Sequence, residues 1–236
     1  SKTRIDLEDV GYSNKITNKA ILKILENAGA RQSETIHFGL NDMENVGFSW
    51  ILLGWKVKIL KRPIYNEELT INTWGRESNR IFTYRDYEIY DESGELCTIA
   101  TSKWAIVDIN TGKLRELTPE IIEKYQCETK KVFKEDYTLK LKEPTTIIRK
   151  QEYKAQRRDI DINKHIHNLY YLDYAYEVLP EEVYEAPECN NIEIMYKKQI
   201  RLNDEFKCLY TKEKNQNIVT MKSEDENTLH AIIKLY

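Results

Sequence analysis

Two ten-residue stretches decide the fold of this chain: residues 9–18 read DVGYSNKITN, and residues 159–168 read DIDINKHIHN. Both begin with Asp, both have Ile at the eighth position, and both end with Asn beside a segment of helical periodicity. This matching placement predicts an internal duplication, so that each half of the chain forms a similar unit. The other seven positions differ, and at three of them Asp161, Asn163 and His165 in the second stretch correspond to Gly11, Ser13 and Lys15 in the first.

The segment after each stretch has the apolar spacing of a helix with one buried face. In residues 21–28 apolar side chains recur at positions i, i+3, i+4 and i+7, and we expect Gly29 to end this helix. Residues 169–179 show a similar pattern, and we expect Pro180 to end the second helix because proline disrupts a helix interior.

Strand-like runs rich in bulky apolar and aromatic residues follow each helix. They cover residues 50–60, 69–74, 81–90 and 96–107 in the first half, and 192–201, 205–214, 218–223 and 229–236 in the second, with a further candidate at 147–158. Short turns separate the runs, and short turns join antiparallel strands, whereas parallel strands need long crossovers. The sequence therefore predicts an α+β fold of two units, each with a curved antiparallel sheet wrapped around one central helix.

Residues 126–146 are charged and only weakly periodic, which is typical of a connector between units. A solvated surface strand is the alternative interpretation of this stretch. We assign residues 1–130 to an N-terminal unit, 131–146 to a linker and 147–236 to a C-terminal unit.

The composition argues against several classes of protein. The 236 residues include 36 Lys and Arg against 39 Asp and Glu, a net charge of −3, whereas a general nucleic-acid binder is usually basic. The 4 cysteines are widely spaced and form no CxxC pair, which disfavours a disulfide framework or a zinc site. No apolar run reaches the roughly 18 residues of a membrane span, and no signal peptide is apparent, so we expect a cytoplasmic protein.

The second stretch is the richest in groups that can do chemistry. A calcium loop also begins Asp-x-Asp-x-Asn, but Lys164 stands where its sharp turn needs Gly, and Tyr170 where it needs a bidentate Glu. A transition-metal site would use Asp161, His165 and His167, and the sequence indicates no further ligand for it.

Two interpretations of this stretch remain. Capping of the helix and the turn accounts for Asp159 and Asn168 but does not require Asp161, Asn163 and His165 together. The other is general-base or nucleophilic chemistry at the start of a helix, where unpaired N–H groups polarise a carbonyl oxygen.

The stretch resembles the Asp-x-Asp-Val-Asn-x-His-Val-Asn-Asn signature of the acyl-ACP thioesterases, plant and bacterial enzymes that hydrolyse fatty acyl-acyl carrier protein. The resemblance covers most of the chain, because residues 50–60, 68–74, 84–89 and 101–104, followed by Asp108, are similar to the first half of that family. The family has a tandem double hotdog fold, which the resemblance therefore implies for this chain.

The resemblance also implies the roles of the site residues. By position, the catalytic Asp, Asn and His of the family fall on Asp161, Asn163 and His165. Asp161 is then the nucleophile or the base that activates water, His165 orients it or transfers a proton, and Asn163 positions the substrate or the carboxylate. Gln199 replaces an acidic residue and Ile200 a cysteine of plant members; Gln199 is no base, but it can orient water or a carbonyl.

No metal or cofactor is expected, and the remaining candidates concern substrate binding. The resemblance implies that the N-terminal unit binds the acyl chain; the candidate residues for substrate binding are Trp50, Trp55, Trp74, His167 and Asn168, and core packing is the alternative for the tryptophans. An acidic carrier protein would meet a basic patch, for which the candidates are Lys154, Arg157, Arg158, Lys197, Lys198 and Arg201.

We therefore expect a hydrolase that releases fatty acid from acyl-acyl carrier protein. An acyl-CoA thioesterase and a non-catalytic hotdog protein that binds acyl groups or their carrier are the alternatives. The protein is expected to be a monomer or a homodimer.

Overall fold

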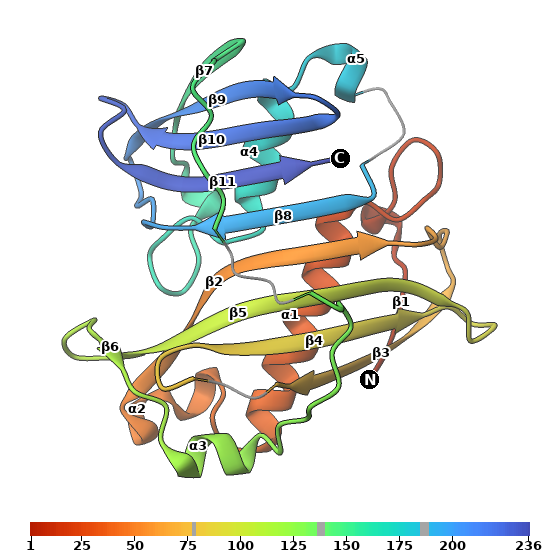
Figure 1. Cartoon of the computed structure of the whole chain (residues 1–236), viewed down its shortest axis with the longest axis vertical. Helices are drawn as coiled ribbons and strands as arrows, with labels where there is room; N and C mark the ends of the chain where they lie inside the picture. The colour runs from red at the N-terminus through yellow and green to blue at the C-terminus, as the bar shows by residue number, and fades with distance from the viewer. Residues whose placement is uncertain (77–78, 136–139, 185–188) are drawn as a thin grey trace. The chain divides into compact units, whose positions relative to one another are not determined.

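The computed structural model describes residues 1–76, 79–135, 140–184 and 189–236. The chain divides into two compact units, residues 1–138 and 139–236, and this boundary lies within the stretch interpreted as a linker. Each unit is an antiparallel sheet with a helix against it, and together they make the tandem double hotdog fold (Figure 1).

The first unit contains the elements β1 (Lys2–Arg4), η1 (Leu7–Asp9), α1 (Asn18–Thr35), η2 (Leu40–Asp42), α2 (Met43–Val46), β2 (Phe48–Ile59), β3 (Glu68–Gly75), β4 (Thr83–Tyr90), β5 (Leu96–Asp108), β6 (Leu114–Arg115) and α3 (Pro119–Lys124). Its strands lie in the order β1-β3-β4-β5-β2, and β6 pairs with β5. All of these pairings are antiparallel, as the short turns in the sequence predicted.

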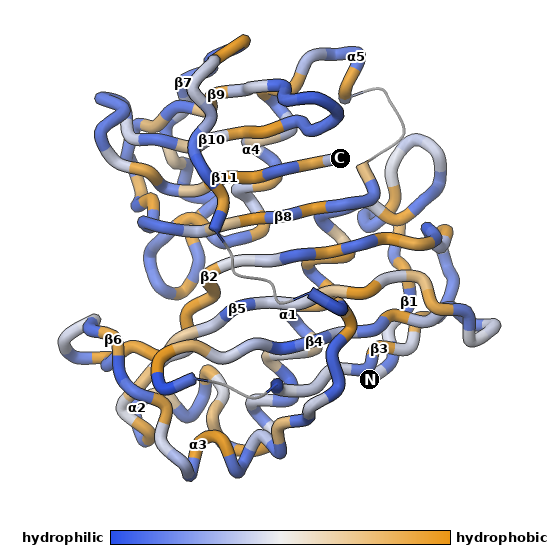
Figure 2. The backbone as a smooth tube through the Cα atoms, in the orientation of Figure 1, coloured by the Kyte–Doolittle hydropathy of each residue, from blue (hydrophilic) through white to orange (hydrophobic). Residues whose placement is uncertain are grey.

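The second unit contains β7 (Arg149–Lys154), η3 (Arg157–Asp159), α4 (Tyr170–Val178), α5 (Glu181–Tyr184), β8 (Asn191–Tyr196), β9 (Glu205–Glu213), β10 (Gln216–Ser223) and β11 (Leu229–Leu235). Its strand order is β8-β11-β10-β9-β7, again antiparallel throughout. Hydrophobic and hydrophilic residues follow one another along strands such as β8, β10 and β11 (Figure 2).

The predicted end of the first helix at Gly29 is wrong, because α1 spans 18 residues and ends at Thr35. Gly29 serves a different purpose, since it lets the helix approach the sheet closely. A Cβ at this position would lie 2.8 Å from Tyr87 Oη and 3.3 Å from Arg85 Cδ on β4. The second helix is as predicted: α4 ends at Val178, directly before Leu179 and Pro180.

Two strands of the second unit are shorter than predicted. The run 147–158 forms only the six residues of β7, because the chain then turns into η3, where the Asp159 carboxylate accepts the N–H of Gln156 at 2.9 Å. The run 192–201 pairs as a strand only to Tyr196, and the residues after it leave β8 to approach the loop 159–168.

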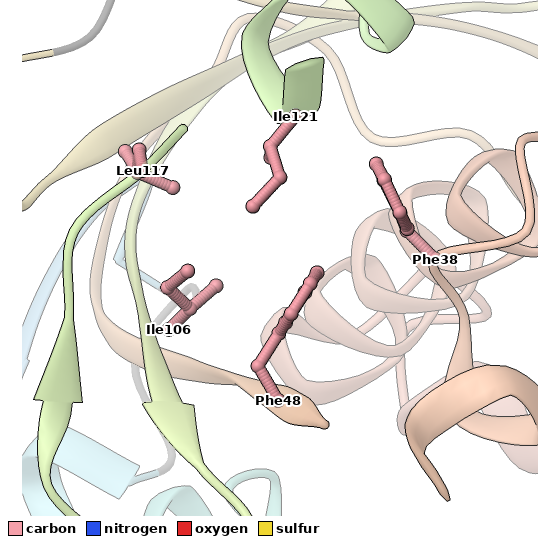
Figure 3. Packing of buried hydrophobic residues seen from close by; sticks show 5 residues of the cluster. All are labelled: Phe38, Phe48, Ile106, Leu117 and Ile121. Atoms are coloured by element: carbon pink, nitrogen blue, oxygen red, sulfur yellow. The ribbon is translucent and has the colours of Figure 1, made fainter. Parts of the chain in front are cut away.

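The first unit has a second apolar cluster at the far end of α1, built from Phe38, Phe48, Ile106, Leu117 and Ile121, whose side chains face one common centre (Figure 3). Trp50 packs on its edge, with ring-centroid distances of 6.1 Å to Phe48 and 5.5 Å to Tyr125. Thr118 starts the covering helix α3 by accepting the N–H of Ile121, with Pro119 at the first helical position.

Candidate active site

The loop 159–168 is anchored at its start by Asp159, which is almost fully buried. Its carboxylate accepts the N–H of Gln156 at 2.9 Å and the hydroxyl of Tyr174 at 2.5 Å, and its backbone carbonyl accepts the N–H of His167 at 2.8 Å. Asp159 therefore has the capping role that was one interpretation of the sequence. It joins the loop to η3 on one side and to α4 on the other.

Asp161 organises the turn that follows. Its Oδ1 accepts the backbone N–H groups of Asn163 at 2.8 Å and His165 at 3.3 Å, while its own N–H donates to the carbonyl of His165 at 2.9 Å. The turn needs a left-handed residue, and Lys164 takes this conformation with φ of 65°. Within the described parts of the chain no group donates a hydrogen bond to Asp161 Oδ2, so this oxygen is open to a substrate or water.

His165 lies on the same turn and is half-buried. Its Nδ1 is buried and has no hydrogen-bond partner among the described residues, which is unusual for a buried polar atom. Burial lowers the pKa of His165, and the charge of Asp161 opposes this shift without overcoming it. The imidazole is therefore neutral at neutral pH, so it can accept or donate a proton.

The first N–H groups of α4 are only partly available. His167 Nδ1 accepts the N–H of Leu169 at 3.3 Å, and the carbonyl of His167 accepts the N–H of Tyr170 at 2.9 Å. The expectation that the helix start as a whole holds a carbonyl oxygen is thus too broad. Among the described residues, the backbone N–H of Asn168 donates to no group, which leaves it free to bind an oxygen. The side chain of Asn163 is exposed and also makes no hydrogen bond there.

Gln199 is exposed and lies on a segment that runs beside the loop. The N–H of Ile166 donates to the carbonyl of Ile200 at 2.8 Å, and His165 forms a β-bridge with Arg201. The N–H of Ile200 in turn donates to the hydroxyl of Tyr171, which is buried on α4, at 3.3 Å. The fold therefore brings the neighbours of Gln199 against the turn that carries His165.

The loop 9–18 of the first unit has the same backbone as the loop 159–168. Gly11 and Asn14 repeat the hydrogen bonds of Asp161 and Lys164, and Asn14 has φ of 58°. The N–H of Ile16 donates to the carbonyl of Pro63 at 2.9 Å, as that of Ile166 does to Ile200. Arg62 is therefore the counterpart of Gln199.

Arg62 closes the equivalent place in the first unit. Its guanidinium donates to the carbonyl of Ile16 at 2.9 Å and to the Oδ1 of the fully buried Asn18 at 2.7 Å, at the start of α1. The first loop thus keeps the shape of the second but lacks its carboxylate and imidazole. In the first unit the Arg62 guanidinium is already hydrogen-bonded at the start of α1.

Sequence reasoning missed two residues that shape this region, Tyr171 and His230. His230 is buried on β11, and its Nδ1 lies 2.8 Å from the carbonyl oxygen of Lys198. Nothing in the local pattern around either residue indicates these contacts, because each joins segments about thirty positions apart.

The candidate carrier-binding residues are all exposed: Lys154, Arg157, Arg158, Lys197, Lys198 and Arg201. They lie on segments adjacent to the loop, because Ala155 and Asp204 are joined by a backbone hydrogen bond of 3.0 Å, and Asp204 caps the turn that begins at Arg201. In the described part of the chain, no three His, Cys, Asp or Glu side chains lie close enough together to hold a metal ion.

The three candidate tryptophans have different surroundings. Trp55 is fully buried against Tyr87, with a centroid distance of 5.4 Å, and Trp50 packs against Phe48 of the apolar cluster described above. Trp74 lines a cavity of about 570 Å³ between α1 and β3. Polar and charged side chains such as Gln32 and Glu88 share this lining, so the cavity is not a purely apolar slot.

Comparison with known families identifies the chain. The model of the acyl-ACP thioesterase N-terminal domain matches residues 1–125, and that of the C-terminal domain matches residues 142–234. The chain belongs to the acyl-ACP thioesterase family. The signature residues of the loop 159–168 lie in the part of the chain that matches the C-terminal domain.

The chain is similar to oleoyl-acyl carrier protein thioesterase 2, chloroplastic, of Arabidopsis thaliana, with 25% identity over 228 residues, covering 90% of this chain and 62% of the relative. It thus spans less than two thirds of the length of that relative. Two solved structures share its fold: an acyl-ACP thioesterase from Bacteroides thetaiotaomicron (TM-score 0.87, 21% identity, 100% of this chain and 95% of that one) and the 12:0-ACP thioesterase from Umbellularia californica (TM-score 0.87, 16% identity, with the same coverage). In the described residues, no helix of this chain is long and apolar enough to cross a membrane.

Proposed function

We propose that this chain hydrolyses the thioester bond of fatty acyl-acyl carrier protein and releases a free fatty acid. One observation carries the proposal: among the described residues, two groups on the turn 161–165 have no hydrogen-bond partner, Asp161 Oδ2 and the buried Nδ1 of His165. The turn itself is held by hydrogen bonds between its two ends, so both groups sit on one rigid piece of backbone. Such preorganisation is what a hydrolytic site needs.

The reaction requires a nucleophile, a place for negative charge and a proton for the leaving group. With Asp161 as base, its carboxylate takes a proton from water while the water oxygen attacks the thioester carbonyl. The carbonyl–sulfur bond then breaks, and the thiolate of the carrier's prosthetic arm leaves and takes up a proton. With Asp161 as nucleophile, its carboxylate attacks the thioester carbonyl, the carbonyl–sulfur bond breaks, and the thiolate leaves and takes up a proton; water then hydrolyses the resulting anhydride to the fatty acid and the free carboxylate of Asp161.

The other residues of the loop have supporting roles in either route. The free N–H of Asn168 stabilises the carbonyl oxygen as it becomes negative. His165 is neutral, and so it can pass a proton between the carboxylate and the leaving thiolate. Asn163 positions the substrate or the carboxylate, and Gln199 orients water or the carbonyl through its amide.

The remaining assignments concern the binding of the acyl chain and its carrier. We assign the acyl chain to the first unit, with Trp50, Trp55 and Trp74 as candidates, and His167 with Asn168 to the thioester end. The exposed basic residues beside the loop complement the acidic surface of an acyl carrier protein. A cytoplasmic location and a monomeric or homodimeric state stay predictions.

A release assay on acyl-acyl carrier protein and acyl-CoA of several chain lengths tests the proposal. We expect fatty acid to be released with a higher kcat/KM from the carrier-bound substrates. A higher kcat/KM for acyl-CoA would identify the alternative thioesterase. Tight binding of acyl carrier without hydrolysis of any thioester would contradict an enzymatic function and favour a binding protein.

A further inference from the structure

The segment that carries Gln199 is fixed on both sides of this residue. On one side Ile200 is bonded to Tyr171 and Ile166, as described above. On the other side the N–H groups of Lys197 and Lys198 donate to the backbone carbonyl of His230 at 2.8 and 3.3 Å. The imidazole of His230 adds a third bond there, since its Nδ1 lies 2.8 Å from the carbonyl oxygen of Lys198.

The direction of this third bond follows from the atoms. A carbonyl oxygen only accepts, so Nδ1 of His230 carries the proton and donates it to Lys198. The imidazole is 94% buried, given its relative exposure of 6%, so water competes little with the bond. The backbone of Gln199 also lies close enough to affect the pKa of His230, which burial lowers.

The first unit shows what the fold needs at this position without the imidazole. Cys97 is the counterpart of His230, because its carbonyl accepts the N–H groups of Leu60 and Lys61 at 2.7 and 3.1 Å. Both residues are the extra residue of a β-bulge: the register skips Cys97 between β4 and β5, and His230 between β10 and β11. The bulge and its two backbone bonds thus belong to the fold of both units.

The side chains at the two bulges differ in what they contact. Cys97 Sγ interacts with the carbonyl of Glu95 at 3.4 Å, within its own strand, and Arg62 is instead held by its own guanidinium. Only the unit with Asp161 and His165 has a bulge side chain that bonds to the segment beside the loop. The turn forms without an imidazole in the first unit, so the imidazole of the second has a purpose beyond folding.

We propose that His230 is a positioning residue of this thioesterase, which holds the backbone of Lys198 so that the next residue, Gln199, stays beside the catalytic loop. The inference rests on the proposed hydrolysis and on the role of Gln199 in it. His230 touches neither the substrate nor the reacting atoms. Its effect therefore falls on kcat through Gln199, with KM unchanged.

The test compares variants at the two equivalent bulges, with fatty acid release measured by mass spectrometry because His230→Cys adds a thiol. His230→Cys places the residue of the first unit in the second, and we expect kcat to fall about 10- to 100-fold at unchanged KM. His230→Asn retains an N–H donor at the Nδ1 position and should retain most of kcat. The matched control Cys97→Ala should leave both constants unchanged.

A double variant shows whether the effect passes through Gln199. If it does, His230→Cys combined with Gln199→Ala is no slower than Gln199→Ala alone. Two results overturn the proposal: a folded His230→Cys enzyme with the wild-type kcat, or single-variant effects that multiply in the double variant.

Two measurements keep the inference testable apart from activity. Amide hydrogen exchange of residues 197–201 should accelerate in His230→Cys and not in Cys97→Ala, even if the wild type hydrolyses no thioester, which would refute only the proposed function. If His230→Cys does not fold, the nitrogen chemical shifts of wild-type His230 decide. A proton on Nδ1 supports the proposal, and a ring protonated only at Nε2 overturns it.

Discussion

Replacing Asp161 by asparagine separates the chemical role of the carboxylate from its structural role. Asp161 Oδ1 accepts two backbone N–H groups, from Asn163 and His165, and these bonds close the turn. The amide oxygen of asparagine can accept the same two bonds, whereas its NH₂ group replaces the open Oδ2. Asp161→Asn should therefore keep the turn and remove the base or nucleophile.

The expected magnitudes follow from these contacts. Loss of a general base lowers kcat by about 10²- to 10⁴-fold, which corresponds to about 3–5 kcal/mol of transition-state stabilisation. The free energy of unfolding should change by less than about 1 kcal/mol, because both hydrogen bonds persist. Asp161→Ala loses both hydrogen bonds, and each bond contributes about 0.5–1.5 kcal/mol, so this variant should lower the free energy of unfolding by about 1–3 kcal/mol.

The assay measures fatty acid release from acyl-acyl carrier protein beside chemical unfolding of the same preparations. Lys15→Ala is the matched control, because Lys15 is the counterpart of His165 in the loop of the first unit, and its kcat should equal that of the wild type. A folded Asp161→Asn enzyme that turns over at the wild-type rate would refute the assignment. So would a loss of turnover in Lys15→Ala as large as in Asp161→Asn.

Three further predictions address other parts of the chain. Arg62→Ala removes the hydrogen bonds to the start of α1 and should lower the free energy of unfolding by about 1–3 kcal/mol with kcat unchanged. A loss of kcat at unchanged stability would contradict a purely structural role of Arg62 in the first unit. Arg157→Glu should raise KM for acyl-acyl carrier protein about fivefold at low salt, but it should not raise KM for a small thioester. Lys212 lies at the end of β9 that is farther in sequence from Asp204, so Lys212→Glu should raise neither KM; equal effects of the two substitutions would refute the proposal that the basic residues beside the loop bind the carrier. Burial lowers the pKa of His230 in the folded protein, so the unfolded chain binds a proton first as the pH falls. The contribution of His230 to the free energy of unfolding is therefore fully present above about pH 6.5, and it is lost as the pH falls through the lower pKa of the folded protein. His230→Asn should reduce the loss of unfolding free energy between pH 7 and 5, and an equal loss in both proteins would argue against this.

Much of the fold could be predicted because its signals are local. Apolar periodicity depends on residues three or four positions apart, and it located both helices and the face of α1 that is buried. The ends of elements were predicted less well where a distant contact decides them. Gly29 does not end α1, because its lack of a Cβ is needed for the approach of Tyr87 and Arg85.

The candidate site shows the same division. The segment Asp161 to His165 forms one closed turn, and sequence reasoning could find it because the turn is made from neighbouring residues. The sequence could not show which of two neighbouring groups is already hydrogen-bonded. The ring of His167 accepts the N–H of Leu169, whereas the backbone N–H of Asn168 donates to no group among the described residues.

The sequence by itself determined the duplicated loop, the two helices and the residue types that make hydrolysis of a thioester the proposed chemistry. Only the tertiary structure decided which polar groups remain without a partner and which are already used. Arg62 and Gln199 occupy equivalent places, yet the Arg62 side chain is hydrogen-bonded to the start of α1, whereas Gln199 is exposed. The physical reason is that hydrogen bonds here join segments far apart in the chain, such as His230 and Lys198, and a linear pattern contains no record of such pairs.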